Sequence, residues 1–365
     1  MISQSGLNRR RLLRNAAFVG AAGTMSAKSR EQIESSGSIT DVGNLRVGHF
    51  TDQRKPTGCT VVLFDKGAVA GVDVRGSAPG TRETDLLNPM NTVERVNAIV
   101  LSGGSAFGLD SASGVMRYLE EHGQGYRVGS IVVPIVPAAI LFDLNVGDPK
   151  IRPDASGGYS ACQAAVSRQV PEGNVGAGAG ATVGKFFGLN SAMKGGLGTA
   201  SIHVGETDLV VGAVVAVNAV GDIFDAQTGR TLAGSLTADG REFRGSGKRV
   251  AGGALLAKRS GGPYAGGNST IGIVATNAVM TKTQMAKVAQ MAHDGLARSI
   301  DPVHTAADGD TIFAAATCSG DTQVDVTTIG VAAAEAMVRA VHRAVLTATS
   351  IPGYPAYRDL PANLR

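Results

Sequence analysis

Residues 266–272, with the sequence GGNSTIG, are the stretch from which the fold and chemistry of this 365-residue chain are best inferred. Two glycines lead into Asn268 and Ser269, and the apolar, β-branched run 271–275 follows, which predicts a buried strand. A hydroxyl residue that opens such a strand is suited to self-cleavage by an N→O acyl shift. The Ser269 hydroxyl attacks the Asn268 carbonyl, and hydrolysis of the ester frees Ser269 as a new N-terminus.

The freed α-amine of Ser269 has the properties of a general base. An α-amine titrates at a pKa of about 7.7–8.0, close to the pH at which general-base catalysis works best. An ordinary turn that enters a strand is the competing interpretation of Asn268-Ser269 taken alone. The hypothesis therefore depends on support from the rest of the chain.

Two acidic residues about 40 positions further on, in residues 304–311 (HTAADGDT), give that support. Asp308 and Asp310 flank a glycine, so both carboxylates can turn toward the new N-terminus without steric cost. One carboxylate positions the Ser269 amine and the other attracts a substrate ammonium, and either aspartate suits either role. Because neighbouring carboxylates repel each other, we expect one of them to have a raised pKa.

Composition excludes several classes of protein. The chain is 43% hydrophobic and 18% charged, and its 50 glycines follow no Gly-X-Y period, which excludes collagen-like and disordered chains. No run of about 18 apolar residues is present, so no membrane-spanning helix is expected. Cys59, Cys162 and Cys318 stand far apart without a C-x-x-C pair, which argues against a zinc finger and a disulfide framework.

The basic charge of the chain belongs to its first 30 residues. They contain six Lys and Arg and no acid, which leaves 28 Lys and Arg against 30 Asp and Glu and no basic footprint for nucleic acid. Residues 8–14 (NRRRLLR), followed by the apolar stretch 16–22 and small residues, match a twin-arginine export signal. We therefore expect a periplasmic or exported protein. A basic tail on a cytoplasmic protein is the alternative.

The body from Ile39 onward shows an α/β pattern without internal repeats. Short β-branched runs predict strands, and 3.6-residue periodicity predicts helices with one side on the core. We expect a core of two sheets covered by helices, with a long loop over residues 228–268. The expected strands are 60–64, 68–74, 98–101, 131–133, 210–217, 271–275 and 311–315, and the expected helices are 109–121, 159–170, 282–298 and 327–347.

Three other motifs favour structural roles. Residues 176–181 (GAGAGA) match a dinucleotide fingerprint, but the later acidic residue is missing and Phe186 stands where a phosphate loop needs Ser or Thr. Phe107 replaces the second glycine of a nucleophile elbow around Ser105, so residues 101–108 predict a tight strand-to-helix turn. The six histidines form no close ligand pair. We therefore expect no nucleotide, no metal and no other cofactor.

Several short motifs together are similar to those of one known family. From Ile39 to the C-terminal helix, the chain resembles the DmpA/BapA-type self-processing aminopeptidases. That family includes L-aminopeptidase/D-esterases, β-peptidyl aminopeptidases and 6-aminohexanoate-oligomer endohydrolases. The motifs are ITDV at 39–42, TGCTV at 57–61, VDVRG at 72–76, LSGGSAFGL at 101–109, GAG at 176–178, VNAVG at 217–221 and DGDT at 308–311.

The resemblance implies a four-layer αββα fold of the N-terminal-nucleophile-like type, as in the DmpA and ornithine acetyltransferase families. Residues 31–365 would form one hydrolase domain after the leader, residues 1–30. Self-cleavage would divide this domain into an α chain, 31–268, and a β chain, 269–365, that stay associated. The resemblance also implies a homo-oligomer of such heterodimers.

The resemblance assigns roles to individual residues. Ser269 corresponds to the nucleophile and Asn218 to the side chain that polarises the acyl oxygen. Lys185 corresponds to a lysine near the nucleophile in the 6-aminohexanoate-oligomer endohydrolases. Asp308 and Asp310 fill two positions that are also Asp in the 6-aminohexanoate-oligomer endohydrolases, the nylon-oligomer branch of the family. The β-peptidyl aminopeptidases have Ser and Glu at these two positions. The nylon-oligomer branch in turn has Thr in place of Ser269.

The expected activity is hydrolysis of small peptides or amides that carry a free amine. Two alternatives come from different classes of function. Ornithine acetyltransferases also cleave themselves at a hydroxyl residue, so an acyltransferase is one alternative. An uncleaved binding protein that kept the fold is the other.

Overall fold

The central sheet of the fold is built around a strand of 17 residues, β2 (Gly58–Val74). The computed structural model describes residues 37–247, 267–320 and 324–365, so the predicted leader, residues 1–30, lies outside the described residues. Across the sheet the strands follow the order β10 (Gly196–His203), β11 (Val210–Asn218), β14 (Ser269–Thr276), β16 (Thr311–Ala316), β2, β4 (Arg95–Ser102), β7 (Ala138–Ile140) and β3 (Thr81–Arg82), with β1 (Leu45–Thr51) beside β2.

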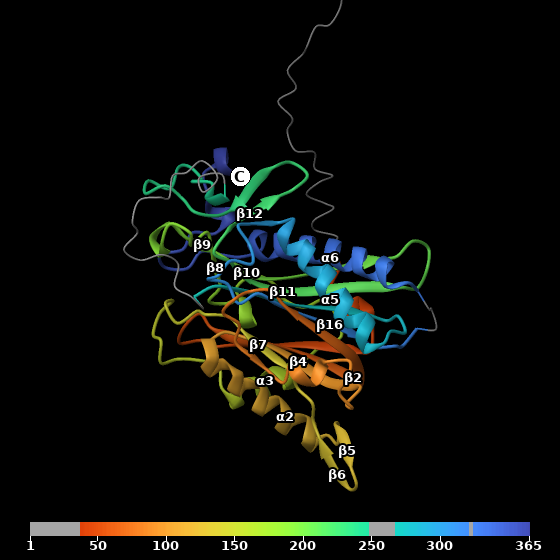
Figure 1. The fold of residues 1–365 in the computed structure, drawn as a ribbon. Coiled ribbons are helices and arrows are strands. Elements are labelled where there is room, and N and C mark those ends of the chain that lie inside the picture. The colour runs from red at the N-terminus through yellow and green to blue at the C-terminus, as the bar shows by residue number, and fades with distance from the viewer. Residues whose placement is uncertain (1–36, 248–266, 321–323) are drawn as a thin grey trace, which may run out of the picture. The chain divides into compact units, whose positions relative to one another are not determined.

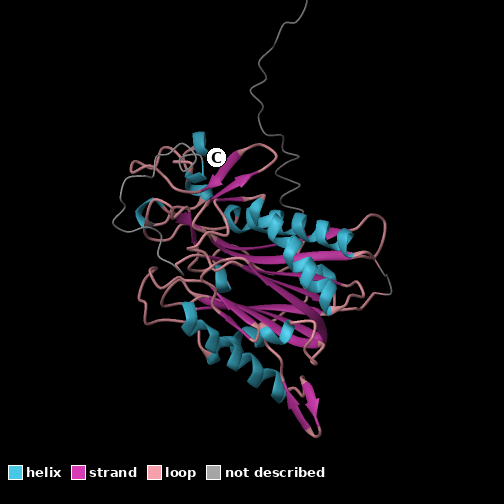
Figure 2. Cartoon of the chain, in the orientation of Figure 1, coloured by secondary structure: helices cyan, strands magenta, loops and turns pink. Residues whose placement is uncertain are grey.

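Four α-helices of the described residues cover this sheet, and shorter elements lie around it (Figure 2). The helices are α2 (Ser111–Glu121), α3 (Ala155–Gln163), α5 (Lys282–Ala297) and α6 (Val326–Leu346). The shorter strands are β5 (Tyr126–Val128), β6 (Ile131–Val133), β8 (Thr182–Val183), β9 (Met193–Lys194), β12 (Asp222–Asp225), β13 (Arg230–Ala233) and β15 (Ile300–Asp301). The 3₁₀ turns are η1 (Ile39–Val42), η2 (Asp85–Leu87), η3 (Ser105–Asp110), η4 (Gly176–Gly178), η5 (Leu189–Ser191), η6 (Tyr357–Asp359) and η7 (Ala362–Leu364).

Strand β2 belongs to two groups of strands at once. Its first half pairs antiparallel with β1 and β4, and its second half pairs antiparallel with β16. The pairing with β4 shifts register between Leu63 and Ala68, and such irregularities bend a strand and increase its twist. The strand can therefore cross from one layer into the next.

Alternating side chains divide the interior into three main cores. In β14, Ile271 lies in the core between the two groups of strands, whereas Val274 packs with residues of α5 and α6. In β4, Ile99 lies in the same central core, whereas Val100 packs with residues of α2 and α3. Strands buried on both faces in this way require a covering layer on each side. Figure 1 shows the resulting helix–sheet–sheet–helix order, which confirms the αββα fold.

Helix α6 packs on β10 because glycines allow a close approach. A Cβ on Gly198 would lie 2.0 Å from the carbonyl oxygen of Ala340, and one on Gly196 would lie 2.2 Å from that of Ala344. Glycines also weaken the strand pattern in a sequence, since they add no side chain to a strand face. For this reason β10 is not among the expected strands.

The expected helix over residues 159–170 is wrong in its position. Helix α3 begins four residues earlier, at Ala155, where the side chain of Asp154 caps its N-terminus. It ends at Gln163, because the chain then turns to pair with β1: the Val47 N–H donates to the Val166 carbonyl, and the Val166 N–H donates to the Val47 carbonyl. The other three expected helices match α2, α5 and α6 within two residues at each end.

Other expectations are corrected in part. The two expected strands 60–64 and 68–74 form the single strand β2. The expected loop 228–268 contains the strand β13, and its residues 248–266 lie outside the described part of the chain.

The two glycine-rich motifs have the structural roles predicted for them. Ser105 (φ +54°) follows Gly104 (φ +84°) and begins η3, which is a tight strand-to-helix turn. In the GAGAGA segment, a Cβ on Gly178 would lie 2.2 Å from the backbone nitrogen of Leu197, so glycine is needed for the close contact with β10. Among the described residues, every helix is too short or too polar to cross a lipid bilayer.

Candidate active site

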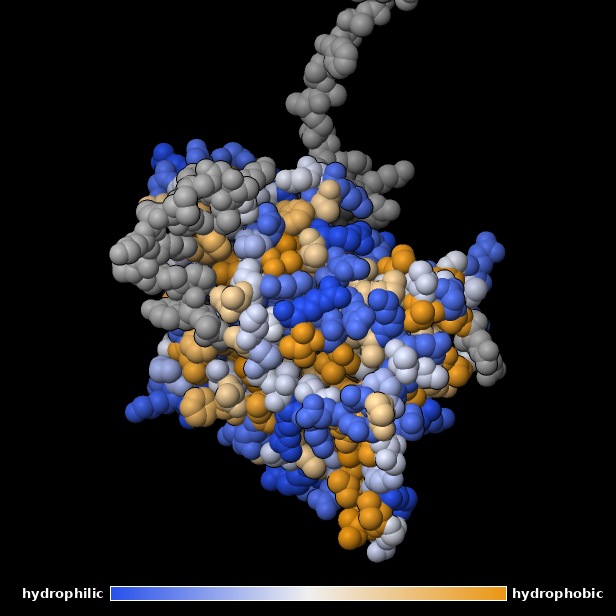
Figure 3. Space-filling model, in the orientation of Figure 1, coloured by the Kyte–Doolittle hydropathy of each residue, from blue (hydrophilic) through white to orange (hydrophobic). Residues whose placement is uncertain are grey.

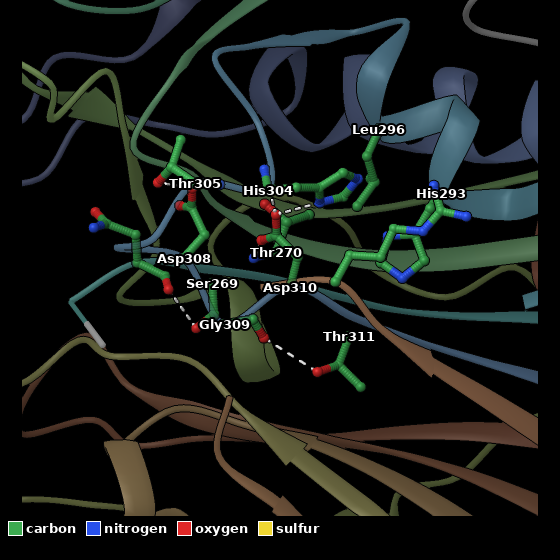
Figure 4. Close-up of polar contacts among 12 residues, drawn as sticks. Ser269, Thr270, His293, Leu296, His304, Thr305, Asp308, Gly309, Asp310 and Thr311 are labelled. Atoms are coloured by element: carbon green, nitrogen blue, oxygen red, sulfur yellow. Dashed lines mark hydrogen bonds and ion pairs between the residues drawn. The ribbon is translucent and has the colours of Figure 1, made fainter. Parts of the chain in front are cut away.

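The start of β14 lies where three parts of the chain meet. Strand β14 is antiparallel to β11, with Ser269 opposite Asn218, and parallel to β16, which begins at Thr311. Because parallel neighbours begin at the same edge of a sheet, the loop before β16 lies beside the start of β14. Accordingly, Asn268 forms a parallel bridge with Asp308. The sheet topology thus brings both acidic residues to the predicted nucleophile (Figure 4).

The carbonyl oxygen of Asn268 accepts two hydrogen bonds at the predicted cleavage point. The hydroxyl of Ser269 donates to it at 2.5 Å, and the backbone N–H of Gly309 donates to it at 2.8 Å. Asn268 is 2% exposed and Ser269 1%, so water hardly reaches this bond. Fixed donors in a buried site stabilise negative charge that develops on such an oxygen. The geometry therefore suits attack on the Asn268 carbonyl.

Gly309 is in close contact with its neighbours on two sides. A Cβ at this position would lie 2.5 Å from the carbonyl oxygen of Ala78 and 2.7 Å from the hydroxyl oxygen of Ser269. The segment after β2 holds this loop in place, because the Ala78 N–H donates to the carbonyl oxygen of Asp308 at 2.9 Å. Only glycine leaves room for the nucleophile here.

Asp310 binds the start of strand β14 through one carboxylate oxygen and His304 through the other. Its Oδ1 accepts the backbone N–H of Thr270 at 2.7 Å. Its Oδ2 accepts the backbone N–H of His304 at 3.2 Å and lies 2.8 Å from the Nδ1 of the same residue (Figure 4). The Thr270 N–H lies one residue beyond the amine that cleavage would free on Ser269.

Asp308 is equally buried and binds different partners. Its Oδ2 accepts the backbone N–H and the hydroxyl of Thr305, at 3.0 and 2.6 Å, and its Oδ1 accepts the N–H of Val220 at 3.4 Å. Burial, and then the neighbouring Asp310, raises the pKa of Asp308 to about 6. One of the two carboxylates thus has the raised pKa that the sequence predicts.

Lys185 lies beside the segment that precedes the predicted cleavage point. Its Nζ donates to Oδ1 of Asn218 at 2.8 Å, to the carbonyl oxygen of Asn218 at 3.0 Å and to that of Gly267 at 3.3 Å. Gly184, directly before it, has a left-handed backbone (φ +70°), and a Cβ there would lie 2.2 Å from the carbonyl carbon of Gly234. Burial lowers the pKa of Lys185 to about 7, although the negative charges of Asp308 and Asp310 act to raise it.

Asn218 is fully buried at the end of β11. Its Oδ1 accepts from Lys185 and from the backbone N–H of Thr182, at 3.0 Å. Its Nδ2 donates to the carbonyl oxygen of Phe142 at 3.1 Å, which uses one of the two amide protons. One amide proton is left for an acyl oxygen, whereas the residue type alone would allow two.

His304 and Gly309 contact the site, although neither is predicted from the sequence. The histidines are expected to be structural because they form no ligand pair along the chain, yet His304 binds Asp310. Its ring lies edge-on to that of His293, with centroids 4.8 Å apart. Both residues lie in the HTAADGDT segment, where the two aspartates are the more obvious chemical groups. Within residues 37–247, 267–320 and 324–365, no three His, Cys, Asp or Glu side chains are grouped to hold a metal ion.

Comparisons of sequence show the family to which the chain is similar. The sequence profile of peptidase family S58 matches residues 37–358. An uncharacterized aminopeptidase of Mycobacterium tuberculosis is 44% identical over 345 residues, which cover 88% of this chain and 97% of the relative. A 6-aminohexanoate-oligomer endohydrolase of a Kocuria species is 30% identical over 312 residues, which cover 82% of this chain and 84% of the relative.

Comparison of structures supports the fold. The L-aminopeptidase D-Ala-esterase/amidase of Ochrobactrum anthropi, described as a variant of the Ntn hydrolase fold, matches with a TM-score of 0.61. The match covers 88% of this chain and 90% of that one at 19% sequence identity. At this identity the similarity concerns the fold alone. The family resemblance predicted from the sequence is confirmed.

Proposed function

Because this chain belongs to peptidase family S58 and is an amide-bond hydrolase, we propose that it cleaves its own Asn268–Ser269 bond and uses Ser269 as its nucleophile. One observation carries the proposal. The carbonyl oxygen of Asn268 accepts hydrogen bonds from both the Ser269 hydroxyl and the Gly309 N–H. The attacking group and an oxyanion donor are therefore already in contact with the bond to be broken.

Self-cleavage would proceed through a tetrahedral intermediate. The Oγ of Ser269 forms a bond to the carbonyl carbon of Asn268, and the negative charge on the oxygen is stabilised by the N–H of Gly309. The C–N bond then breaks, and the nitrogen of Ser269 leaves as an amine that takes up the proton released by the hydroxyl. Water hydrolyses the ester, which leaves Asn268 with a carboxylate and restores the hydroxyl of Ser269.

Lys185 is suited to accept the proton of the hydroxyl. Its pKa of about 7 leaves much of the amine neutral near pH 7, and the neutral amine, which keeps two of the three hydrogen bonds of Nζ, is a base. Its Nζ binds the carbonyl oxygen of Gly267, two residues before Ser269. Lys185 thus supplies a base in the precursor, where Ser269 has no free amine.

Turnover of substrate would use the amine that cleavage creates. The α-amine of Ser269 acts as the general base for its own hydroxyl, and the remaining amide proton of Asn218 binds the acyl oxygen. The pairing of β11 with β14 supports this role, since it places Asn218 directly opposite Ser269. Asp308 and Asp310 divide two tasks between them, the orientation of this amine and the attraction of a substrate ammonium.

The proposed substrates are small amides or short peptides with a free amine. Two buried carboxylates at the nucleophile favour a cationic group over a neutral one. The names of the relatives, aminopeptidase and 6-aminohexanoate-oligomer endohydrolase, both describe cleavage of amide bonds and support this range. Aminoacyl p-nitroanilides and ω-amino acid oligomers are the first compounds to test.

Association of the heterodimers into a homo-oligomer is supported by the β5–β6 hairpin. The register places Tyr126 opposite Val133 and Val128 opposite Ile131, so the four side chains share one face. All four are exposed, Ile131 by 62%, and Figure 3 shows apolar surface at this tip. The same face of a second copy would cover it. Ile131→Asp is expected to lower the mass measured by light scattering, and an unchanged mass would argue against this interface.

Export by the twin-arginine route is proposed from the sequence of the first 30 residues. Arg9 and Arg10 stand in a leader without acidic residues. Replacement of both by Lys is expected to keep the protein in the cytoplasm. Cytoplasmic location of the unmutated protein, with residues 1–30 intact, would contradict export.

Substitution of Ser269 tests the proposed function. Ser269→Ala is expected to remain one chain without activity, whereas Ser269→Thr keeps part of both functions, because Thr retains the hydroxyl and suits a strand. Ser105→Ala is the matched control, since it removes a hydroxyl from the other tight turn considered above. Normal cleavage of the Ser269→Ala chain would place the nucleophile elsewhere.

A further inference from the structure

We propose that His304 is a positioning residue for the nucleophile. It holds the carboxylate of Asp310 in the orientation in which Oδ1 binds the N–H of Thr270, and thereby fixes the start of β14 at Ser269. This inference rests on the proposed function, because it concerns the same nucleophile. His304 itself touches neither the hydroxyl of Ser269 nor the Asn268 carbonyl in any hydrogen bond of the described residues.

The geometry fixes both oxygens of Asp310. The Oδ2 atom has two donors on one residue, the backbone N–H of His304 at 3.2 Å and its Nδ1 at 2.8 Å. A carboxylate is planar, so two donors on one oxygen also set the direction of the other. That other oxygen, Oδ1, binds Thr270 at 2.7 Å. Asp310 is 1% exposed, so its oxygens depend on donors of the protein.

The chemistry of the partners fixes the proton on His304. Both oxygens of Asp310 accept backbone N–H groups, so Nδ1 of His304 is assigned as a further donor to Oδ2. The neighbouring His293 lies with its Nε2 3.0 Å from the carbonyl oxygen of Asp73, so this nitrogen carries its hydrogen. Burial lowers the pKa of His293 to about 4, which keeps its ring neutral near pH 7.

The second ring nitrogen of His304 and of His293 indicates the role of His304. The Nε2 of His304 and the Nδ1 of His293 are buried and have no hydrogen-bond partner in the described residues. A buried polar atom without a partner costs free energy, so it needs a compensating contact. For the side chain of His304, the contact with Asp310 is the hydrogen bond that compensates.

The backbone of His304 is also unusual. Its φ of +54° lies in the left-handed region, which Gly and Asn adopt readily and which His adopts more often than most other residues. In this conformation its N–H and its ring reach the same oxygen of Asp310. The left-handed backbone of His304 is therefore needed for its contact with Asp310.

Loss of the ring donor is expected to release Asp310. Its Oδ2 would keep only the backbone N–H of His304, and the carboxylate would be free to rotate. The N–H of Thr270 would then lose its acceptor, and Ser269 its fixed position. Self-cleavage and the chemical step of turnover should slow together, whereas substrate binding should change little.

Two substitutions separate the ring donor from the backbone strain. His304→Gly accepts the left-handed conformation and lacks the donor, whereas His304→Asn accepts it and offers an amide N–H near the position of Nδ1. We expect His304→Gly to lower the self-cleavage rate and kcat about 10- to 100-fold, with KM nearly unchanged, as for the loss of a hydrogen bond to a buried charge. His304→Asn is expected to recover most of both rates.

A control and a double substitution complete the experiment. His342→Asn removes another half-buried histidine, whose Nε2 lies 3.1 Å from the carbonyl oxygen of Phe224, and should leave both rates unchanged. If His304 acts through Asp310, then His304→Gly combined with Asp310→Asn should be no slower than Asp310→Asn alone.

The outcomes distinguish this inference from the function on which it rests. Three results would each overturn the positioning role while wild-type cleavage stands. The first is a His304→Gly chain with wild-type rates, and the second is a His304→Asn chain as slow as His304→Gly. The third is a double variant in which the rate losses of His304→Gly and Asp310→Asn multiply in full. A wild-type chain that never divides between Asn268 and Ser269 would overturn the proposed function and the positioning role together. If His304→Gly fails to fold, His304→Ala, which also lacks the ring donor, takes its place in the comparison with His304→Asn and in the cycle with Asp310→Asn.

Discussion

Gly309 donates its backbone N–H to the carbonyl oxygen of Asn268 at 2.8 Å, although 41 positions separate the two residues in the sequence. The parallel pairing of β14 with β16 makes this contact, since both strands begin at the same edge of the sheet. The same oxygen accepts the hydroxyl of Ser269. The bond proposed for cleavage is therefore polarised by the loop that also carries Asp308 and Asp310.

Gly309→Ala is expected to slow self-cleavage strongly. The new methyl group would lie 2.7 Å from the hydroxyl oxygen of Ser269 and 2.5 Å from the carbonyl oxygen of Ala78, so the loop has to move away from the scissile bond. Loss of one oxyanion donor costs about 10²–10³ in rate. The measurement is the fraction of cleaved chain over time on a denaturing gel.

A second glycine provides the control for that variant. Gly320→Ala places its methyl group 3.4 Å from the carbonyl oxygen of Asn277, which is an ordinary contact, and should cleave as the wild type does. Equal rates for Gly309→Ala and Gly320→Ala would contradict the role of Gly309.

The rate of self-cleavage is expected to rise with pH through about 7. Burial lowers the pKa of Lys185 to about 7, so its neutral, basic form increases as the pH rises past this value. Lys185→Arg keeps the charge and cannot act as a base at these pH values, so it should remain uncleaved. Refolding of the precursor at a series of pH values gives the profile. A rate that is flat between about pH 5 and 9 would exclude Lys185 as the base.

Stability of the uncleaved Ser269→Ala chain should also rise with pH, between about 7 and 8.5. Burial lowers the pKa of both Lys185 and Lys194 to about 7 from the ordinary 10.5. Above pH 7 the unfolded chain therefore binds more protons than the native chain, and the free energy of unfolding increases. Urea unfolding at the two pH values measures this. The increase should be smaller in the Ser269→Ala, Lys185→Met double variant, and an equal increase would show that Lys185 is charged in the fold.

The two aspartates are expected to differ in their kinetic effects. Asp310→Asn should lose most turnover, because an amide has one accepting oxygen and cannot accept from both Thr270 and His304 as the two carboxylate oxygens do. Asp308→Asn should mainly raise KM for cationic substrates, which is the sign of lost ground-state binding. Both are measured on an aminoacyl p-nitroanilide and its N-acetylated counterpart. Equal wild-type rates on these two substrates would refute recognition of a free amine.

Much of the fold follows from sequence patterns that depend on local chemistry. The β-branched runs of β11, β14 and β16 and the periodic helices α5 and α6 are buried on the faces that their patterns indicate. Strand β10 and the start of α3 are not predictable in this way. In β10, close packing against the backbone of α6 requires Gly196 and Gly198. Helix α3 ends early because the chain after it pairs with Val47 of β1.

The candidate site likewise contains residues whose roles the sequence predicts and residues whose roles it does not. The hydroxyl, amide, amine and carboxylate groups of the site belong to residue types whose chemistry is evident in the sequence. The roles of Gly309 and His304 are not evident, because they depend on which strand begins beside β14. A backbone N–H and a ring nitrogen gain their importance from position alone.

Intact-mass measurement with N-terminal sequencing of the purified protein tests the central claim most directly. Self-cleavage predicts two chains of about 27 and 10 kDa from the 37.1 kDa total, less any removed leader, with the smaller chain beginning at Ser269. An active preparation that consists of one undivided chain, or a smaller chain that begins at another residue, would contradict the account.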